Sequence, residues 1–168
     1  MTKRILITAA LISLFSFSAF AQKVSGSFKS LKEEVRVQMD IDFSSADIMG
    51  MNEEAFSGYE QDWNIDKPEI LGYIYAYANK GMGGNLAVGN YPNHPGGSKL
   101  VLKVVSVSVK GDYDCDLYLY DAEGREIGKA SGIRGKGGTF GTKLNLMKDG
   151  ARRTGAAVGR FLYSARLR

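Results

Sequence analysis

Aromatic and acidic residues alternate along one segment of the chain, residues 112–121. If that segment is a strand, Tyr118 and Tyr120 share a face with Asp114 and Asp116, because side chains two residues apart point the same way. Tyrosine offers an apolar ring with a polar tip, and a carboxylate accepts hydrogen bonds from hydroxyl or amide groups. We therefore predict a ligand-binding face for a glycan or peptide, formed by these four residues.

Three further aromatic residues are candidates for the same kind of contact. Tyr75 falls off the apolar face of a predicted helix, and Trp63 and Tyr91 fall in predicted loops. Exposed aromatic groups mark binding surfaces for sugars, peptides or proteins. The tyrosines can also simply be amphipathic rings that cover the rim of the core, and the sequence favours this interpretation.

A glycine-rich run at residues 132–143 resembles a phosphate-binding loop at first sight, because it precedes a predicted helix and carries cations. The run does not match the known residue spacings of phosphate-binding loops. The chain has Gly-Thr-Lys at 141–143 in place of Gly-Lys-Ser/Thr, and Phe140 stands where a dinucleotide fingerprint needs glycine. We predict a flexible strand-to-helix connection. The alternative is a weak anion-binding site formed by Arg134, Lys136 and Lys143.

Four acidic residues have the spacing of a calcium loop: Asp112, Asp114, Asp116 and Glu123. Leu117 occupies the position where such a loop turns sharply at glycine, and the flanks are strand-like rather than helical. The solvent face of a strand explains the spacing better.

Catalytic motifs are scarce. The single histidine, His94, lies in a turn, and the sequence offers it neither a second metal ligand nor the partners of a Ser-His-Asp triad. We predict a surface histidine, no catalytic residue, no metal site and no cofactor. Hydrolysis by a carboxylate pair stays open, because such a pair forms in space rather than in sequence.

The elements that must position these residues follow from hydrophobic periodicity. Alternation of period two predicts half-buried strands over 35–43, 100–109 and 112–121. Lys110-Gly111 joins the last two as an antiparallel hairpin. Weaker strands are expected within 24–31, at 86–88 in a long loop over 81–99, and over 125–133. In the segment 100–109 we expect one face to hold Val101, Val105, Val107 and Val109.

Two helical regions are predicted. Asn52 is a good N-cap for one, and Asp66 followed by Pro68 marks a second start, so 53–80 reads as a broken helix or two short ones. The last helix, about 142–165, has an apolar stripe at spacings of three and four. Its small residues should let it lie close on a sheet: Gly150, Gly155 and Gly159.

These elements predict an α+β fold. Polar residues on one face of each strand indicate that one face of the sheet is in water. The expected architecture is a two-layer sandwich, with an antiparallel or mixed sheet of about four or five strands and two main helices on one face.

The N-terminus has the three parts of a secretory signal peptide: Lys3 and Arg4, an uncharged apolar run from Ile5 to Phe20, and small residues before Gln22. The run is shorter than the roughly 20 apolar residues of a spanning helix. We predict cleavage after Ala21, with an uncleaved anchor as the alternative. Residues 22–168 would form a single domain, without another stretch of membrane-spanning length.

One cysteine, Cys115, remains in that domain, so the expected core carries its stability without an internal disulfide. We predict that Cys115 is a buried small hydrophobe; a reactive thiol or an intermolecular disulfide is the alternative. Residues 22–121 hold 9 basic and 15 acidic residues, whereas 122–168 hold 11 basic and 3 acidic. We expect the two parts to neutralise each other in one fold, with an anionic partner as the alternative.

Glycine-hydrophobic patterns over residues 86–89, 100–104 and 155–162 resemble small secreted or periplasmic domains of unknown function from Bacteroidetes-type bacteria. The resemblance covers about 86–165 and implies a cell-envelope α+β module. It implies no activity and no catalytic residues.

The function expected from these features is an exported binding or interaction module, located in the periplasm or at the cell surface. Its partner would be an envelope glycan, peptide or protein, and not a nucleic acid. Two alternatives remain: a carboxylate-dependent hydrolase, and a membrane-surface protein that uses its basic C-terminal helix.

Overall fold

The computed structural model describes residues 22–91 and 97–167. The predicted signal peptide, its cleavage site at Ala21, and His94 lie outside the described residues. Among the residues that are described, no helix is both long and apolar enough to cross a membrane.

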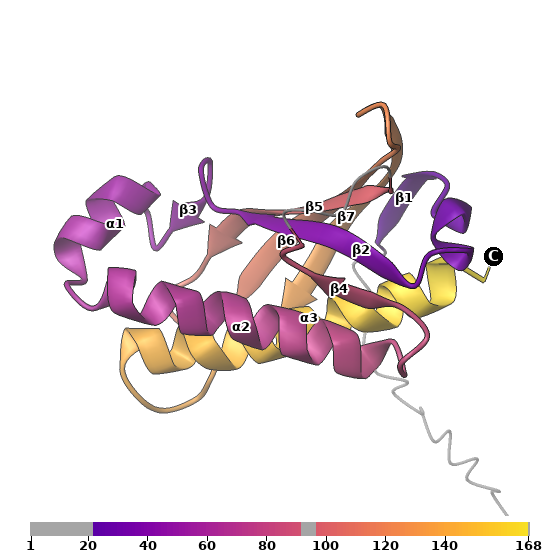
Figure 1. The fold of residues 1–168 in the computed structure, drawn as a ribbon. Coiled ribbons are helices and arrows are strands. Elements are labelled where there is room, and N and C mark those ends of the chain that lie inside the picture. The colour runs from indigo at the N-terminus through magenta and orange to yellow at the C-terminus, as the bar shows by residue number, and fades with distance from the viewer. Residues whose placement is uncertain (1–21, 92–96, 168) are drawn as a thin grey trace, which may run out of the picture.

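The described residues form an α+β fold with one seven-stranded mixed sheet and three α-helices (Figure 1). The class is as predicted, but the sheet is larger than the expected four or five strands. Short strands at Lys23–Gly26 and Ala87–Gly89 fall where only weak strands were expected. The two-residue strand Asp47–Ile48 was not expected, because it is too short to show a period of two. The elements in chain order are β1 (Lys23–Gly26), a 3₁₀ helix (Lys29–Lys32), β2 (Arg36–Asp42), β3 (Asp47–Ile48), α1 (Glu53–Tyr59), α2 (Trp63–Gly81), β4 (Ala87–Gly89), β5 (Lys99–Val107), β6 (Tyr113–Tyr120), β7 (Glu126–Gly135) and α3 (Lys143–Ala165).

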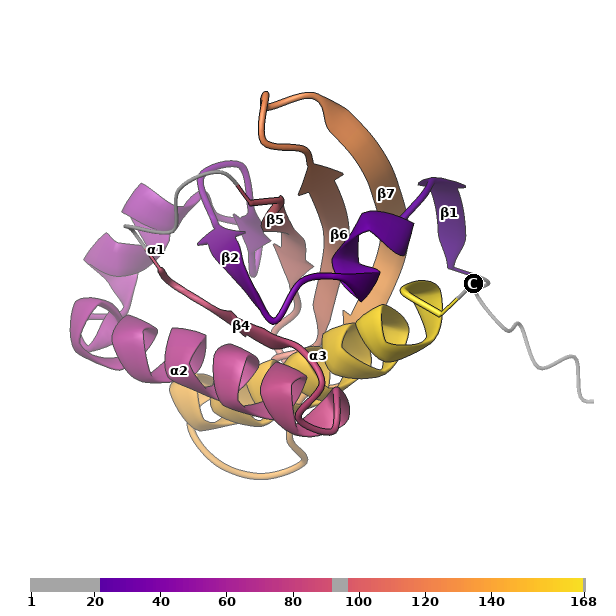
Figure 2. The same ribbon diagram turned by 45° about the vertical axis from the view of Figure 1, so that its right-hand side comes forward.

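The strand order is β1-β7-β6-β5-β2-β4, and β3 also pairs with β5. The strands β5, β6, β7 and β1 are antiparallel neighbours, whereas β2 runs parallel to both β4 and β5. Parallel neighbours need a crossover connection, and α2 supplies it. Both long helices, α2 and α3, lie on one face of the sheet (Figures 1 and 2).

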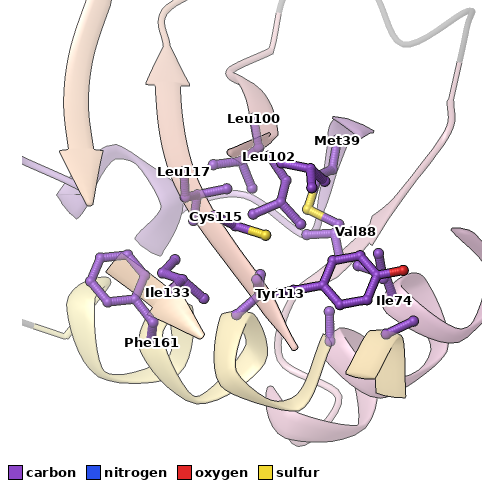
Figure 3. Packing of buried hydrophobic residues seen from close by; sticks show 14 of the residues in the cluster. Met39, Ile74, Val88, Leu100, Leu102, Tyr113, Cys115, Leu117, Ile133 and Phe161 are labelled. Atoms are coloured by element: carbon purple, nitrogen blue, oxygen red, sulfur yellow. The ribbon is translucent and has the colours of Figure 1, made fainter. Parts of the chain in front are cut away.

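The strand β6 has the predicted orientation. Tyr113, Cys115, Leu117 and Leu119 are all buried, and Figure 3 shows the first three among the core side chains on the helix side. Cys115 is fully buried, and this burial raises the pKa of its thiol. The prediction that Cys115 behaves as a buried hydrophobe is confirmed.

The orientation predicted for β5 is wrong. Its buried residues are Leu100, Leu102, Val104 and Val107. Val105 is 48% exposed, and Val109, beyond the strand, is 64% exposed. Two features conceal the true orientation: both faces carry apolar residues, and a bulge between Val104 and Ser106 shifts the alternation by one. Val101 and Lys103 therefore point away from the helices.

The break between α1 and α2 is as predicted, but α2 begins three residues before Asp66. The amide of Ala55 donates to the side chain of Asn52, which caps α1. The first residue of α2 is Trp63, whose ring meets Phe43 and Phe56 edge-on at centroid distances of 5.7 and 5.2 Å. Burial of this indole explains the early start, and it places Pro68 inside the helix.

The small residues of α3 pack mainly against the other helix, not against the sheet as predicted. A Cβ at Gly155 would overlap the carbonyl oxygen of Ile74, and one at Gly159 would overlap that of Ala78. The matching order of these contacts shows that α2 and α3 run side by side in the same direction. Gly150 alone of the three predicted glycines faces the sheet, where a Cβ would overlap the carbonyl oxygen of Gly111.

Tyr113, which is buried, and Tyr75, which is half-buried, differ in the hydrogen bonding of their hydroxyl groups. The hydroxyl of Tyr113 is buried and has no hydrogen-bond partner among the described residues. The hydroxyl of Tyr75 donates to the carbonyl oxygen of Met39 at 2.8 Å, and burial, followed by the charge of Asp40, raises its pKa to about 12. Tyr75 is thus bonded to the sheet and is not an exposed contact residue.

Gly155→Ala should destabilise the fold by about 1–3 kcal/mol, because the added methyl group separates the two helix backbones. The matched control is Gly72→Ala in α2, where a Cβ meets nothing within 4 Å. That change should stabilise the protein by about 0.5–1 kcal/mol through helix propensity alone. Urea unfolding of both variants measures the difference. Equal stabilisation by the two alanines would contradict the close helix contact.

Tyr113→Phe should leave the free energy of unfolding unchanged or raise it by about 1 kcal/mol, because it removes a buried donor without a partner. Tyr75→Phe should lower that free energy by about 1 kcal/mol, because it leaves the Met39 carbonyl without its donor. Thermal and urea unfolding of the pair check this. A larger loss for Tyr113→Phe than for Tyr75→Phe would show that the assignment of partners is wrong.

Candidate ligand-binding face

The face of the sheet opposite α2 and α3 carries all four predicted ligand-binding residues. Tyr118, Tyr120, Asp114 and Asp116 alternate along β6 with its buried residues, and each is partly exposed. We call this side of β2, β5, β6 and β7 the open face. Its position follows from the fold, because both long helices cover the other side (Figure 2).

Cross-strand ion pairs cover much of the open face. Arg134 of β7 lies 3.0 Å from Asp114, and Lys129 lies 3.3 Å from Asp116. Each pair joins the acidic part of the chain to the basic part, as does Lys148, which contacts Asp66 and Glu69 on α2. Ion pairs between the two parts of the chain are therefore present within the fold, as expected.

These ion pairs change what the predicted residues can offer to a ligand. Asp116 also accepts from the amide of Gly132 at 3.2 Å, so much of its hydrogen-bonding capacity is in use. The ring of Tyr118 has ammonium groups over it from both neighbouring strands, Lys103 at 5.3 Å and Lys129 at 4.8 Å from the centroid. Cations held over a ring compete with a ligand for its face.

Tyr120 differs from Tyr118 because it borders a hollow. The two rings lie nearly parallel, at 19° and 6.4 Å between centroids. The hollow has a volume of about 650 Å³, within the range of small-ligand sites. We call it the Tyr120 hollow; its main lining residues are Gln38, Tyr91, Lys99, Val101, Lys103 and Tyr120.

Hydrogen bonds hold one wall of the Tyr120 hollow in place. The side-chain oxygen of Gln38 accepts from the amide of Tyr91, and its Nε2 donates to Asp40 at 2.6 Å and Asn90 at 3.2 Å. Asp40 in turn binds the ammonium of Lys99 at 2.7 Å. These bonds hold the segment after β4 to β2, and the Asp40–Lys99 ion pair joins β2 to β5.

The turn after β6 closes one end of the hollow and contributes Asp121 to its lining. The backbone amide of Arg125 donates to this carboxylate at 2.9 Å, and the guanidinium lies 2.8 Å away. The hydrogen bond from the Arg125 backbone amide, together with the Arg125 guanidinium, holds the pKa of Asp121 below its usual value. Asp121 is therefore ionised at neutral pH, and an ionised carboxylate cannot act as a general acid.

The glycine-rich run at 132–143 is held by bonds to its own protein. Asp112 accepts from the amide of Gly137 at 2.7 Å, and Arg153 donates to the carbonyl groups of Lys136 and Gly137. Gly137 has a second reason to be glycine, because a Cβ there would overlap the backbone of Lys110.

Of the predicted anion-binding residues, two come together and the third lies apart. Arg134 and Lys136 line a second hollow of about 400 Å³ together with Asp112 and Asp114. The ammonium of Lys143 lies 4.2 Å from the ring centroid of Tyr59 on α1.

The acidic series that has calcium-loop spacing is spread along a strand and its flanks. Asp114 and Asp116 lie within β6, and Asp112 accepts from the hydroxyl of Ser108 at 3.0 Å. Within residues 22–91 and 97–167, no group of three or more histidine, cysteine or acidic residues is arranged to hold a metal ion.

Sequence reasoning misplaced two aromatic candidates, Tyr75 and Trp63, and missed most of the hollow. Trp63 is 1% exposed, and its Nε1 donates to Glu53 at 3.1 Å, so it belongs to the core. Lys99 and Lys103 were missed because β5 was given the wrong orientation. Gln38 was missed because two of its partners, Asn90 and Tyr91, lie more than 50 residues away in sequence. The signal that could have found the lysines is their alternation with Leu100 and Leu102.

No family model matches this chain, and no curated protein matches it. Among solved structures, a PelC dodecamer from Paraburkholderia phytofirmans has a TM-score of 0.47 and 12% identity, covering 84% of this chain and 96% of that one. A variant PelC dodecamer from the same organism has a TM-score of 0.41 and 14% identity, covering 84% and 98%. Likeness at this level supports no conclusion about function, ligand or assembly.

Proposed function

We propose that the protein is an exported cell-envelope binding module that holds a glycan in the Tyr120 hollow. The observation that supports the proposal is a hollow of about 650 Å³ on the open face. Two tyrosines, Tyr91 and Tyr120, and two lysines, Lys99 and Lys103, line it. Aromatic rings bind the apolar faces of sugars, and the surrounding polar groups bind their hydroxyls. Side chains on a sheet also hold such a site more rigidly than loops do.

A glycan fits this position better than an extended peptide. Peptides commonly bind sheets by adding a strand at an edge, which requires unpaired backbone groups. The lining strand β5 is paired with β2 and β6, and β6 is paired with β5 and β7. The hollow therefore offers side chains rather than backbone, which favours a ligand recognised through its rings and hydroxyls.

Export is supported by the sequence alone. The basic start, apolar run and small residues before Gln22 are typical of a secretory signal peptide. The resemblance to small secreted or periplasmic domains agrees with an envelope location. We propose the periplasm or the cell surface.

Two alternatives have less support. A carboxylate-dependent hydrolase would most simply use Asp112 and Asp114 of the second hollow, but Asp112 holds the Gly137 amide and Asp114 lies against Arg134. A membrane-surface protein would use cations of α3. Several of these are engaged inside the protein, including Lys148 with Glu69 at 2.6 Å and Arg152 with Asp149 at 2.7 Å.

Protein isolated from its native host should begin at Gln22. N-terminal sequencing of the soluble envelope fraction checks this. Intact Met1 recovered in a membrane fraction would show that the leader is an uncleaved anchor.

Binding should be found on an array of envelope glycans and peptides probed with residues 22–168. Tyr120→Ala should weaken binding of the glycan by about tenfold, because tyrosine is enriched among the contact residues whose truncation costs more than 1 kcal/mol. The matched control is Tyr163→Ala, which removes a tyrosine that is 46% exposed on α3; it should leave affinity unchanged.

Three outcomes would count against this proposal. Equal affinity for wild type and Tyr120→Ala would remove the hollow as the site. Binding of peptides alone would exclude the glycan. Turnover of an array ligand that is lost in Asp112→Asn would favour the hydrolase.

A further inference from the structure

Resting on the proposed function, we propose that the glycan is anionic and that the ammonium of Lys103 binds its acidic group. The chemical class is a carboxylated saccharide, such as a polymer of uronic acids. The proposal depends on the charges around the Tyr120 hollow, which differ from those on the rest of the open face.

Lys103 differs in its partners from three other cations of the open face. Lys99, Lys129 and Arg134 each lie within 3.3 Å of a carboxylate oxygen. Lys103 has no carboxylate within ion-pair distance in the described part of the chain, and its ammonium lies over the ring of Tyr118. It also lines the Tyr120 hollow.

The carboxylates nearest to Lys103 in the sheet register are occupied by other donors. Lys103 lies opposite Asp42 on β2 and Asp116 on β6. Asp42 accepts from the amide of Ser44 at 2.8 Å, and Asp116 is shared between Lys129 and the Gly132 amide. Hydrogen bonds from Ser44, followed by the charge of Lys103, hold the pKa of Asp42 below its usual value. No ion pair joins Lys103 to either carboxylate among the described residues, so its ammonium can still bind an external anion.

The lining of the hollow has an excess of positive charge. Two lysines, Lys99 and Lys103, face one carboxylate, Asp121. From outside the lining, Asp40 neutralises Lys99 at 2.7 Å and Arg125 neutralises Asp121 at 2.8 Å, so the excess charge is that of Lys103. A carboxylate brought into the hollow would therefore meet an attractive field, and a charge-assisted hydrogen bond to an ammonium is stronger than a neutral one.

The aromatic rings favour a sugar as the molecule that carries the anionic group. An ammonium alone would serve any anion, but Tyr120 and Tyr91 line the same hollow. A uronic acid combines an apolar ring face for a tyrosine with a carboxylate for Lys103. Sulfated saccharides share the anionic chemistry, and the experiment separates the two.

The experiment compares oligogalacturonate with the same oligomer after methyl esterification, which removes the charge and keeps the sugar. Affinities are measured by calorimetry on residues 22–168. We expect the acid to bind at least about tenfold more tightly than the ester. We also expect its affinity to fall as salt is raised, because screening weakens surface charge interactions.

Lys103→Gln should abolish the difference between acid and ester. Lys110→Gln is the matched control, because it removes the same charge at an exposed position outside the hollow. It should keep the difference. Thermal unfolding of both variants verifies that they fold, and sulfated dextran fragments give the sulfate arm.

The outcomes separate this inference from the proposed function. Acid and ester bound equally, each dependent on Tyr120, would overturn the anionic ligand and leave the glycan site standing. Binding of neutral glycans alone would likewise overturn the anionic ligand and leave the glycan site standing. Oligoglutamate bound in a Lys103-dependent manner, or sulfated dextran preferred over oligogalacturonate, would overturn the carboxylated saccharide. Absence of any glycan binding would overturn both proposals.

Discussion

The close contact between α2 and α3 is the constraint on which the rest of the structure depends. Gly155 and Gly159 let the two helix backbones touch at Ile74 and Ala78, so the helices form one compact layer. Because this layer covers a single face of the sheet, the other face stays open along β2, β5, β6 and β7 (Figure 1). Helix α3 also packs closely against the β5–β6 turn at Gly150. The position of the candidate site is thus a consequence of helix packing.

The open face is polar without being uniform. Most of its charges are matched across neighbouring strands, and such exposed pairs contribute little to stability, about 0–1 kcal/mol each. Their effect is to neutralise the acidic and basic parts of the chain locally. Around Lys103 this matching is incomplete, and there the two tyrosine rings and the Gln38 network shape a hollow. Recognition by this protein would therefore depend on one region of the face rather than on its total charge.

Much of the fold could be predicted because its signals are local. The alternation in β6, the Asn52 cap and the apolar stripe of α3 each lie within a few residues of sequence, and all three are observed. The errors arise where distant contacts override local pattern. Trp63 extends α2 backwards because Phe43 and Phe56 bury its ring. The valines of β5 indicated the wrong buried face, because a bulge and apolar residues on both faces conceal the alternation.

The sequence by itself determined which residues of β6 face the core and which face water, because a strand's period of two needs no knowledge of its neighbours. It thereby placed Tyr118, Tyr120, Asp114 and Asp116 on one surface. Only the tertiary structure decided what each of them can do. Neighbouring strands bring Lys129 and Arg134 to the two carboxylates, hold lysines over Tyr118, and leave Tyr120 beside a hollow. Those partners come from other strands of the sheet, and they meet the residues of β6 only through the register of strand pairing, which depends on the turns between strands and on which faces are buried.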